Sequence, residues 1–378
     1  GLYCTGCEEF KQPAQVVDGH CIEHPTLDLV PTRETNHFFR LSGYTDRLHS
    51  LITSGELAVE PAIRRNEILR LLEGGLQDIS ISRSRFPWGI PFPGDPDHTV
   101  YVWFDALINY LSATGFPEEG YERLWPADLH IVGKGITRFH CVIWPAMLLA
   151  AELPLPRKVW AHGYVQWEGT KMSKTAGTAV SLQSAMDRHG ADALRYFLLR
   201  EVGFEQDGNF SWERFDERYT ADLADGLGNL ASRSLAMLVK YREGIVPEGA
   251  ETELDQVGES ALEAWGRAMD ELDLRGGAEA AGTLVAAANS YITRMAPWTL
   301  AKEGKDRELD AVMTTLARCL ARLTCMLGPF MPSKSAELRG ALGYPPGPPE
   351  TALSLSDIST ITGQTVRKPD NLFPRPVI

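Results

Sequence analysis

Two groups of residues in this 378-residue sequence have the types and the spacing to do chemistry. Cys4, Cys7, Cys21 and His24 follow the spacing C-x2-C-x13-C-x2-H. Each close pair can reach one ion from a tight turn, and the two pairs complete a tetrahedral Cys3His shell that suits zinc. This closed shell predicts a structural zinc ion that organises the polar segment around it. His20, beside Cys21, is the alternative fourth ligand.

The second group lies in the Gly- and Thr-rich stretch EGTKMSKTAGTAV at residues 168–180. Lys171 and Lys174 place two ammonium groups three residues apart, and an ammonium group is a usual partner of phosphate. The small residues around them would let such a loop close over a triphosphate. Taken alone, two lysines in a polar loop are more often simply solvated.

The secondary structure expected to position these groups differs along the chain: helices come first, and strands alternating with helices follow. Helices are expected in DRLHSLITSGE and IRRNEILRLLEGG, each ending at glycine. TVYVWF, DLHIVGKG and RKVWAHGYV are expected to be strands, with helices in DALINYLSATG, starting at Asp105, and in ITRFHCVIWPAMLLAAE. Strands alternating with helices predict an α/β fold with a parallel sheet. Because ligands bind at the carboxyl ends of such strands, Trp103 and Gly133 are expected at the mouth of a site.

Several aromatic residues gather in these strand–helix units. Trp103, Ala106 and Tyr110 are spaced i, i+3 and i+7, and Phe139, His140 and Trp144 come from the next unit. Aromatic edges suit a polarizable thioether. Ordinary core packing is the alternative and is the commoner meaning of such periodicity.

Composition limits the possible classes of protein. The net charge of −13, with 44% apolar and 23% charged residues, is typical of a globular protein and argues against non-specific coating of nucleic acid. No run of about 18 apolar residues is present. Six cysteines, three of them near the N-terminus, indicate one metal site in a reducing compartment. The length predicts two or three domains, and the start at Gly1 without a leader suggests that upstream sequence precedes it.

The motifs together resemble the class I aminoacyl-tRNA synthetases, and most closely the methionyl-tRNA synthetase family. The resemblance runs in order through GLYCTGCEEF, NHFFRLS, DISISR, PWGIP, YVWFDALINYL, VGKG, FHCVIWPAML, KMSKT, DALRYFLLRE, ADLADGLGNLASR and APWTLAKE. It implies ATP-dependent activation of methionine and transfer to initiator and elongator tRNA(Met) in the cytoplasm. It also implies structural zinc, magnesium with ATP and no membrane partner.

The resemblance also assigns residues. Lys171 and Lys174 would be catalytic and would bind ATP, together with Gly133, Lys134, His162 and Gly163. Methionine would be bound by Trp103, Ala106, Tyr110, Phe139, His140 and Trp144, with Tyr110 and His140 near the sulfur. Asn229, Arg233 and Trp298 would read the CAU anticodon, since splayed bases are recognised by stacking and by donors to their edges. Trp298 follows Pro297, so a core aromatic at a helix end is the alternative.

The implied organisation has five parts. Residues 1–97 would be a connective insertion with a zinc knuckle at about 1–35, and 98–180 the second half of a Rossmann-like catalytic domain. Residues 181–210 would be linking helices, 211–345 an α-helical anticodon-binding domain and 346–378 a C-terminal tail.

Two departures from the family pattern bear on activity. Gly135 stands where the family usually has an acidic residue, and the H-x-G-H motif that helps to bind ATP is absent. We expect that motif and the first half of the nucleotide-binding fold upstream of Gly1, and no activity from the 378 residues alone. A non-catalytic product that keeps only tRNA binding and another class I synthetase are the alternatives.

Overall fold

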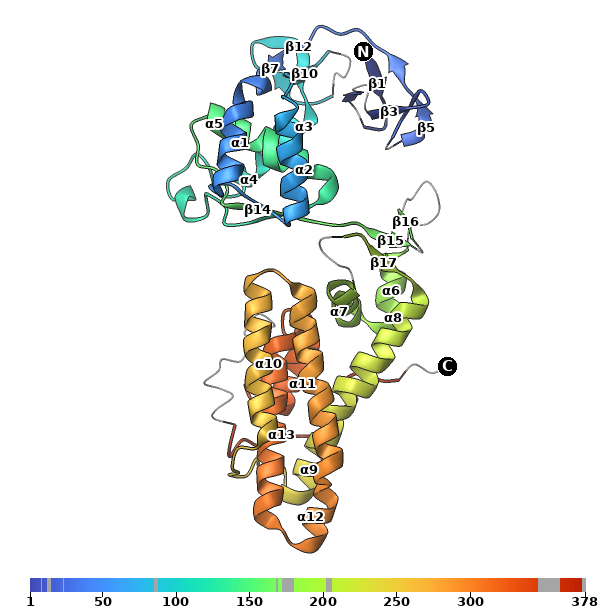
Figure 1. The fold of residues 1–378 in the computed structure, drawn as a ribbon, viewed down its shortest axis with the longest axis vertical. Coiled ribbons are helices and arrows are strands. Elements are labelled where there is room, and N and C mark those ends of the chain that lie inside the picture. Colours follow the sequence, from blue (N-terminus) through green and yellow to red (C-terminus); the bar gives the residue numbers. More distant parts are fainter. Residues whose placement is uncertain are drawn as a thin grey trace. The chain divides into compact units, whose positions relative to one another are not determined.

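The computed structural model describes residues 1–7, 9–11, 15–22, 24–84, 88–167, 169–171, 180–201, 206–345 and 361–375. The backbone forms two compact units, Gly1–Ala161 and His162–Ile378. Each unit has a hydrophobic core of its own. Figure 1 shows the first unit in blue to green and the second in green to red.

The first unit consists of short strands and helices. Its strands are β1 (Leu2–Cys4), β2 (Glu9–Lys11), β3 (Val16–Val17), β4 (His20–Cys21), β5 (His24–Asp28), β6 (Val30–Pro31), β7 (Phe38–Phe39), β8 (Ala58–Glu60), β9 (Ile79–Ser80), β10 (Ser82–Arg83), β11 (Pro91–Phe92), β12 (Asp95–Val100), β13 (His130–Gly133) and β14 (Lys158–His162). Its helices are α1 (Thr45–Ser54), α2 (Ala62–Glu73), α3 (Val102–Ala106), α4 (Asn109–Ser112) and α5 (Trp144–Ala150), with single turns η2 (Leu41–Tyr44), η3 (Tyr121–Arg123), η4 (Lys134–Ile136) and the π-helical η5 (Phe139–Ile143).

The predicted parallel pairing is confirmed in this unit. Strand β14 is the central strand of a three-stranded sheet with the order β13-β14-β8, and β14 and β8 run parallel with Val159 opposite Val59. Val159 is fully buried and Val59 almost so, because both lie in the core that helices α1, α2 and α5 help to build. Helix α1 ends at Gly55 in the left-handed conformation, as the sequence predicted.

The prediction for TVYVWF is wrong in its second half. Strand β12 ends at Val100 and pairs antiparallel with β10 and β11, outside the parallel sheet. The Phe104 N–H donates to the Tyr101 carbonyl, which starts helix α3 at Val102 and places Trp103 in a helix rather than at a strand end. Asp105 lies inside α3 and does not cap it. A short run of β-branched and aromatic residues fits either state, and the backbone partners decide between them.

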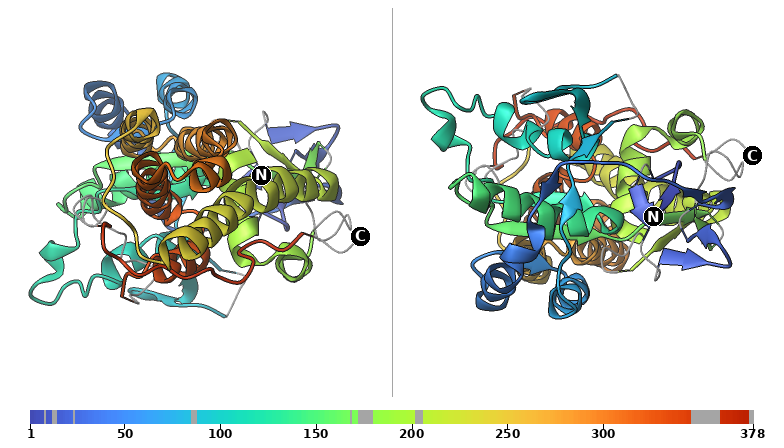
Figure 2. Two further views of the ribbon diagram at one scale, coloured as in Figure 1. Left: turned by 90° about the horizontal axis from the view of Figure 1, so that it is seen from below. Right: turned by 90° about the horizontal axis from the view of Figure 1, so that it is seen from above.

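The second unit is mainly helical. It contains β15 (Val165–Trp167), β16 (Thr170–Lys171), β17 (Gly208–Phe210), α6 (Leu182–His189), α7 (Ala191–Glu201), α8 (Trp212–Arg218), the π-helical η6 (Tyr219–Gly228), α9 (Asn229–Arg242), α10 (Glu253–Asp270), α11 (Leu274–Met295), α12 (Pro297–Glu303), α13 (Asp306–Leu327) and α14 (Pro332–Ala341). The predicted helical region is thereby confirmed. Helices α10, α11 and α13 contact one another and lie side by side in Figures 1 and 2.

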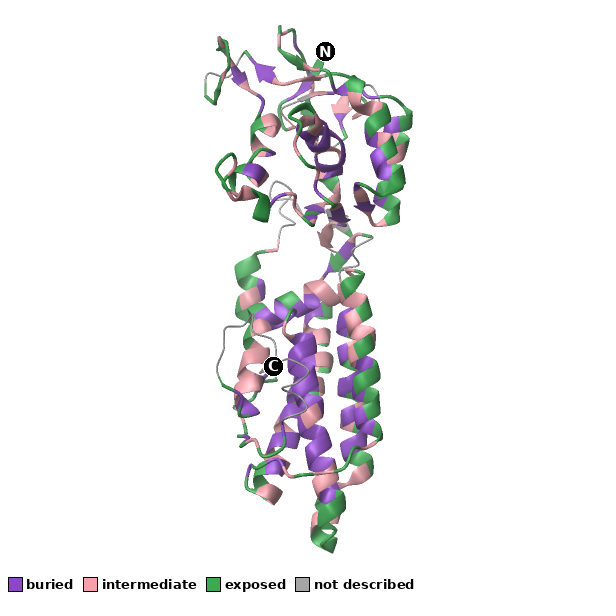
Figure 3. Ribbon diagram, turned by 90° about the vertical axis from the view of Figure 1, so that its left-hand side faces the viewer, coloured by how far each residue is buried: buried purple, intermediate pink, exposed green. Residues whose placement is uncertain are grey.

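Helix α13 forms the centre of this unit. Most of its side chains from Leu309 to Leu327 are buried, whereas α10 and α11 bury one face each. Figure 3 shows the buried residues gathered along the inside of the helices, with exposed residues on their outer faces. A helix whose side chains are buried on nearly every side is enclosed by its neighbours.

One carboxylate is buried in this helical core. Asp255 is 2% exposed and accepts hydrogen bonds from Arg318 Nε at 2.8 Å, from the Thr315 hydroxyl at 2.7 Å and from the Thr252 N–H at 3.0 Å. Burial alone would raise the pKa of Asp255, but these partners lower it to about 2. The carboxylate therefore joins the start of α10 to the middle of α13.

Candidate functional site

The four predicted metal ligands come together at the start of the chain. Cys4 ends β1, Cys21 ends β4 and His24 begins β5. Their ligand atoms and that of Cys7 all lie within 4.8 Å of one another, and the Cys7 and Cys21 Sγ atoms are 3.6 Å apart. Two sulfurs bound tetrahedrally to zinc at about 2.3 Å would be about 3.7 Å apart. The residues present therefore fit a zinc ion.

Two neighbours bear on this cluster. A Cβ atom at Gly6 would lie 2.7 Å from Cδ2 of His24, so only glycine leaves room for the imidazole between the paired cysteines. Sequence reasoning missed Gly6, although a glycine within a C-x2-C pair is a visible signal. The ring of His20, the alternative ligand, lies 3.4 Å from the Leu27 carbonyl and is not part of the group of four.

The predicted methionine-binding residues form one aromatic cluster in the first unit. The rings of Trp103 and Phe139 stack with centroids 3.9 Å apart. Tyr110 has its ring centroid 5.6 Å from that of His140 and 6.2 Å from that of Trp144. Ala106 is half-buried and shares helix α3 with Trp103. Three separate elements, α3, α4 and the η5–α5 segment, thus supply the cluster.

The hydrogen bonds of His140 fix its tautomer. Its Nδ1 lies 2.9 Å from the Ile136 carbonyl, which can only accept, so Nδ1 carries the proton. Its Nε2 then accepts from the Tyr110 hydroxyl at 2.8 Å. Burial lowers the pKa of His140 despite the opposing effect of the Ile136 carbonyl, so the ring is neutral at neutral pH. Tyr110 and His140 therefore form a fixed, uncharged pair.

His130 is a neighbour that sequence reasoning did not single out. It begins β13, and its ring lies 4.4 Å from that of Tyr110. Burial and the nearby His140 lower the pKa of His130 to about 4. Both His130 Nε2 and Trp144 Nε1 are buried and have no hydrogen-bond partner in the part of the chain that the structure describes. Buried polar atoms are rarely unpaired, so these two atoms mark the cluster as a place for a polar ligand group or water.

The predicted ATP-binding residues of the first unit follow β13. Gly133 is the last residue of this strand, as the sequence predicted, and Lys134 begins the turn η4. The Thr137 hydroxyl donates to the Lys134 carbonyl at 3.0 Å and closes that turn. Gly135, which replaces the usual acidic residue, is exposed at its centre.

The remaining predicted ATP-binding residues belong to the second unit. His162 is the last residue of β14 and the first residue of the second unit, and Gly163 follows it before β15. A Cβ atom at Gly163 would lie 2.1 Å from the Gln206 carbonyl oxygen. Asp207 accepts from the Tyr164 N–H at 2.9 Å and from Gln166 Nε2 at 3.0 Å, which joins β15 to β17. Lys171 ends β16, which pairs antiparallel with β15. Lys174 lies outside the described residues.

Two of the three predicted anticodon residues lie on one face of α9. Exposed Asn229 and half-buried Arg233 line a groove of about 530 Å³ with Asp225 of η6 and with residues of α11. Trp298 lies on α12 with 47% of its surface exposed, and it is not among the residues that line this groove. Its exposure is unlike that of a core aromatic, which was the alternative for this position.

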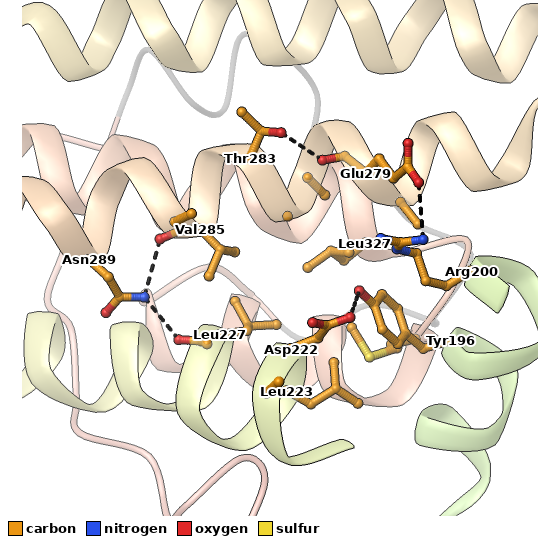
Figure 4. Close-up of a pocket in the computed structure, with 17 residues that line it drawn as sticks. Tyr196, Arg200, Asp222, Leu223, Leu227, Glu279, Thr283, Val285, Asn289 and Leu327 are labelled. Carbon is orange, nitrogen blue, oxygen red and sulfur yellow. Dashed lines mark hydrogen bonds and ion pairs between the residues drawn. The ribbon is translucent and has the colours of Figure 1, made fainter. Parts of the chain in front are cut away.

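Asn289 of α11 is a third residue that sequence reasoning missed. Its amide nitrogen donates to the Gly226 and Val285 carbonyls, both at 3.2 Å, and its oxygen accepts from Asn229 at 3.3 Å. It lines both the groove and a cavity of about 510 Å³ between α7, η6 and α11 (Figure 4). A polar residue on a helix face otherwise rich in alanine was the only available signal.

The charged groups of that cavity are paired. Arg200 lies 3.1 Å from Glu279, and the Tyr196 hydroxyl donates to Asp222 at 3.1 Å, as the dashed lines in Figure 4 mark.

Among the described residues, no helix combines the length and the apolar character needed to cross a lipid bilayer.

Comparisons with known proteins cover nearly the whole chain. The family model described as tRNA synthetases class I (M) matches residues 1–235, and the one described as the anticodon binding domain of methionyl tRNA ligase matches residues 243–376. Methionine--tRNA ligases of Caldanaerobacter subterraneus subsp. tengcongensis and of Streptomyces coelicolor are each 42% identical over 99% of this chain. The chain spans 60% of the first relative's length and 74% of the second's.

A solved structure agrees with this match. The Mycobacterium tuberculosis methionyl-tRNA synthetase bound by methionyl-adenylate superposes with a TM-score of 0.90 at 36% identity, over 99% of this chain and 76% of that one. The similarity therefore includes both the strand–helix unit with the aromatic cluster and the helical unit. The chain belongs to the methionyl-tRNA synthetase family of class I tRNA synthetases.

Proposed function

We propose that the protein activates methionine with ATP to methionyl-adenylate and transfers the methionyl group to tRNA(Met). The observation that carries the proposal is the aromatic cluster around the buried, neutral Tyr110–His140 pair, in a chain of this family. Methionine offers a thioether that gains from aromatic edges and carries no charge that would need a buried counter-ion. A neutral imidazole and a phenol suit such a side chain better than an imidazolium does.

The activation step itself needs no side-chain base. The methionine carboxylate attacks the α-phosphorus of ATP, and pyrophosphate leaves. Catalysis of this kind rests on positioning and on stabilising the charge that moves to the leaving group. We assign that stabilisation to the ammonium groups of Lys171 and Lys174, and the positioning of ATP to the backbone around Gly133, Lys134, His162 and Gly163. Magnesium would accompany ATP and neutralise its phosphates.

A structural zinc ion belongs to this proposal. Cys4, Cys7, Cys21 and His24 would hold it, because their ligand atoms have the spacing of a tetrahedral sulfur–nitrogen shell. Since four protein ligands leave no open position, the ion would stabilise the fold and would take no part in the reaction. As an enzyme of translation, the protein would act in the cytoplasm.

Transfer to tRNA requires recognition of the anticodon. We assign hydrogen bonding to base edges to Asn229 and Arg233, and stacking to Trp298, whose exposed indole offers a flat surface. Trp298→Ala should weaken tRNA(Met) binding by about 1–3 kcal/mol, the usual effect of losing one stacked base. Filter binding would measure this effect, with Trp88→Ala as the control because Trp88 is 92% exposed in the other unit. Equal affinities of the two variants would exclude stacking on Trp298.

Methionine-dependent ATP–pyrophosphate exchange tests the activation step. It should be measured on the protein at the length that its gene encodes, with the Lys174→Ala variant beside the wild type. Removing a charge contact made in the transition state commonly costs on the order of 10²–10³-fold in rate. Exchange that depends on another amino acid would overturn the assignment of the substrate. tRNA(Met) binding without any exchange would support the alternative of a non-catalytic tRNA-binding protein.

A further inference from the structure

A second group of metal-ligating side chains lies in the first unit, apart from the four residues of the zinc cluster. It consists of His37, which precedes β7, and of Asp95 and His98, which belong to β12. One ligand atom from each of the three lies within 4.8 Å of the other two. The fold therefore places His37 next to Asp95, which lies 58 positions later in the sequence.

One carboxylate oxygen is shared by both imidazoles. Oδ2 of Asp95 is 2.8 Å from Nε2 of His37 and 2.8 Å from Nδ1 of His98. Donor atoms bound side by side to one ion at 2.0–2.1 Å lie about 2.9–3.4 Å apart. The observed spacing is at the short end of this range, so a small outward movement of each group would admit an ion.

The other nitrogen of His98 determines what its Nδ1 can do. Nε2 of His98 lies 2.8 Å from the Thr35 carbonyl and must donate its proton there. Neutral His98 therefore presents a lone pair at Nδ1, toward an oxygen that also carries lone pairs. Among the described residues this buried Nδ1 has no hydrogen-bond partner, whereas the Thr35 carbonyl and the Asp95 carboxylate raise the pKa of His98. Unless the ring takes up a second proton, two acceptors face each other at 2.8 Å.

A second proton on the ring would resolve this conflict, and so would a metal cation between the two atoms. We propose that His37, Asp95 and His98 bind a divalent first-row transition metal ion of the zinc type, with a fourth position open to water. Two imidazoles and one carboxylate are ligands that such ions accept, whereas calcium and magnesium prefer oxygen alone. The hydrogen bond from His98 to the Thr35 carbonyl matches the way in which a metal-bound histidine is held by a backbone carbonyl.

The exposure of the three side chains supports access for an ion. The His98 side chain is 13% exposed, that of Asp95 31% and that of His37 43%, so the group opens to solvent on the His37 side. The His37 ring stacks on Phe92 with centroids 4.3 Å apart, which holds it in place. The backbone N–H of His37 also donates to the Ser82 hydroxyl at 2.9 Å.

The ion would act as a cross-link. It would join the segment around residues 35–37 to β12, the strand that leads directly into α3 and Trp103. The ligand sphere contains no cysteine, which separates this site spectroscopically from the zinc cluster at the N-terminus.

The test is metal loading of the full chain after dialysis against a chelator. Cobalt(II) is the probe, because thiolate ligands give it a strong charge-transfer absorption that imidazole and carboxylate ligands do not. The wild type, His98→Gln, Asp95→Asn and the control His49→Gln are compared by elemental analysis. His49 lies on α1 and is not part of the group of three. A Cys7→Ser, His24→Ala double variant removes the sulfur-bound ion and reports the second site alone.

We expect the wild type, the His49→Gln variant and the double variant each to bind one cobalt ion per chain without sulfur ligands. In His98→Gln and Asp95→Asn, the affinity for this ion should fall at least tenfold. The thiolate absorption should persist in the latter two, which also shows that they are folded. A wild type that binds no sulfur-free ion would overturn the proposal. A sulfur-free ion that His98→Gln and Asp95→Asn both still bind with wild-type affinity would overturn it too. A doubly protonated His98 at neutral pH in the metal-loaded protein, detected by NMR, would overturn it too.

Discussion

At the scale of residues, the chemistry depends on which side chains are kept uncharged. His140 donates from Nδ1 to the Ile136 carbonyl and accepts at Nε2 from Tyr110, and burial disfavours a second proton on either His140 or His130. A neutral pair can surround a thioether without the cost of burying a charge. In the proposed methionine-binding site, specificity for an apolar sulfur side chain would therefore depend on this hydrogen bond.

Tyr110→Phe tests the pair directly. The substitution leaves the ring in place but removes the hydroxyl, so that His140 Nε2 becomes a buried acceptor without a donor, at a cost of about 1–3 kcal/mol. We expect methionine to bind about tenfold more weakly, as measured by calorimetry. Tyr121→Phe is the matched control, since Tyr121 packs edge-on against Phe116 in the same unit. Unchanged methionine affinity in Tyr110→Phe would show that the pair does not face the substrate.

At the scale of elements, two contacts connect parts of the second unit: the backbone at Gly163 packs against Gln206, and the buried Asp255 carboxylate pairs with Arg318. Gly163 allows the chain to pass against the Gln206 carbonyl just before β15, and the parallel pairing of β15 with β17 follows. In the helical core, Asp255 bonds to Thr252 at the N-cap of α10 and to Arg318 of α13. The approach of Gly163 to Gln206 and the bond between Asp255 and Arg318 both join segments that are distant in sequence.

Gly163→Ala should destabilise the second unit. The added Cβ would lie 2.1 Å from a backbone oxygen that cannot rotate away, so the two segments must separate, at a cost of about 1–3 kcal/mol. Gly282→Ala is the control, because nothing lies within 4 Å of a Cβ at that position of α11 and alanine favours a helix by up to about 1 kcal/mol. Thermal unfolding followed by circular dichroism distinguishes the two. Equal melting temperatures would contradict the packing argument.

Asp255→Asn should destabilise the helical unit by about 3–5 kcal/mol, because Arg318 and Arg322 would then be left without their buried carboxylate. Asp270→Asn on the exposed end of the same helix is the control. The pKa of Asp255 is lowered from 3.8 to about 2 in the folded state, so its contribution is complete above about pH 4 and is lost as the pH falls toward 2. Denaturant unfolding across that range should show the wild type and Asp255→Asn converging in stability. Parallel curves would exclude the linkage.

At the scale of the whole molecule, the chain has two separate cores and a segment with little core of its own. The described residues between 1 and 31 form six short strands, and their buried side chains are those of Tyr3, Cys4, Lys11 and Cys21. The proposed zinc ion would therefore be needed to stabilise this segment. The helical unit is built around the buried side chains of α13, and we expect its stability not to require the zinc ion.

Removal of zinc by a chelator should therefore act locally. Hydrogen exchange should become fast in the strands that carry Cys4, Cys21 and His24, while α13 stays protected and the helical circular dichroism changes little. Protection should return when zinc is added back, and the Cys7→Ser variant should show fast exchange from the outset. Slow exchange throughout the N-terminal strands of the metal-free protein would contradict a structural role for the ion.

The sequence by itself determined the features that depend on local spacing. The paired cysteines, the glycine-ended helices α1 and α2, Gly133 at the end of β13 and the apolar stretch of α13 could all be predicted, because turn geometry, caps and periodicity act within a few residues. The motif series also identified the family, and the aromatic residues Trp103, Tyr110, Phe139, His140 and Trp144 were predicted as one group.

Only the tertiary structure decided what depends on distant partners. It ended β12 at Val100 and put Trp103 in a helix, since the β10 and β11 backbones supply the antiparallel partners. It brought His130 against Tyr110 and Asn289 against Asn229, and it placed His37 beside Asp95 and His98. The contacts of Tyr110 with His130, of Asn229 with Asn289 and of His37 with Asp95 join residues that lie 20 to 60 positions apart, so spacing along the chain does not predict them. They arise because packing brings distant groups together, and each polar group then takes the partner that packing provides.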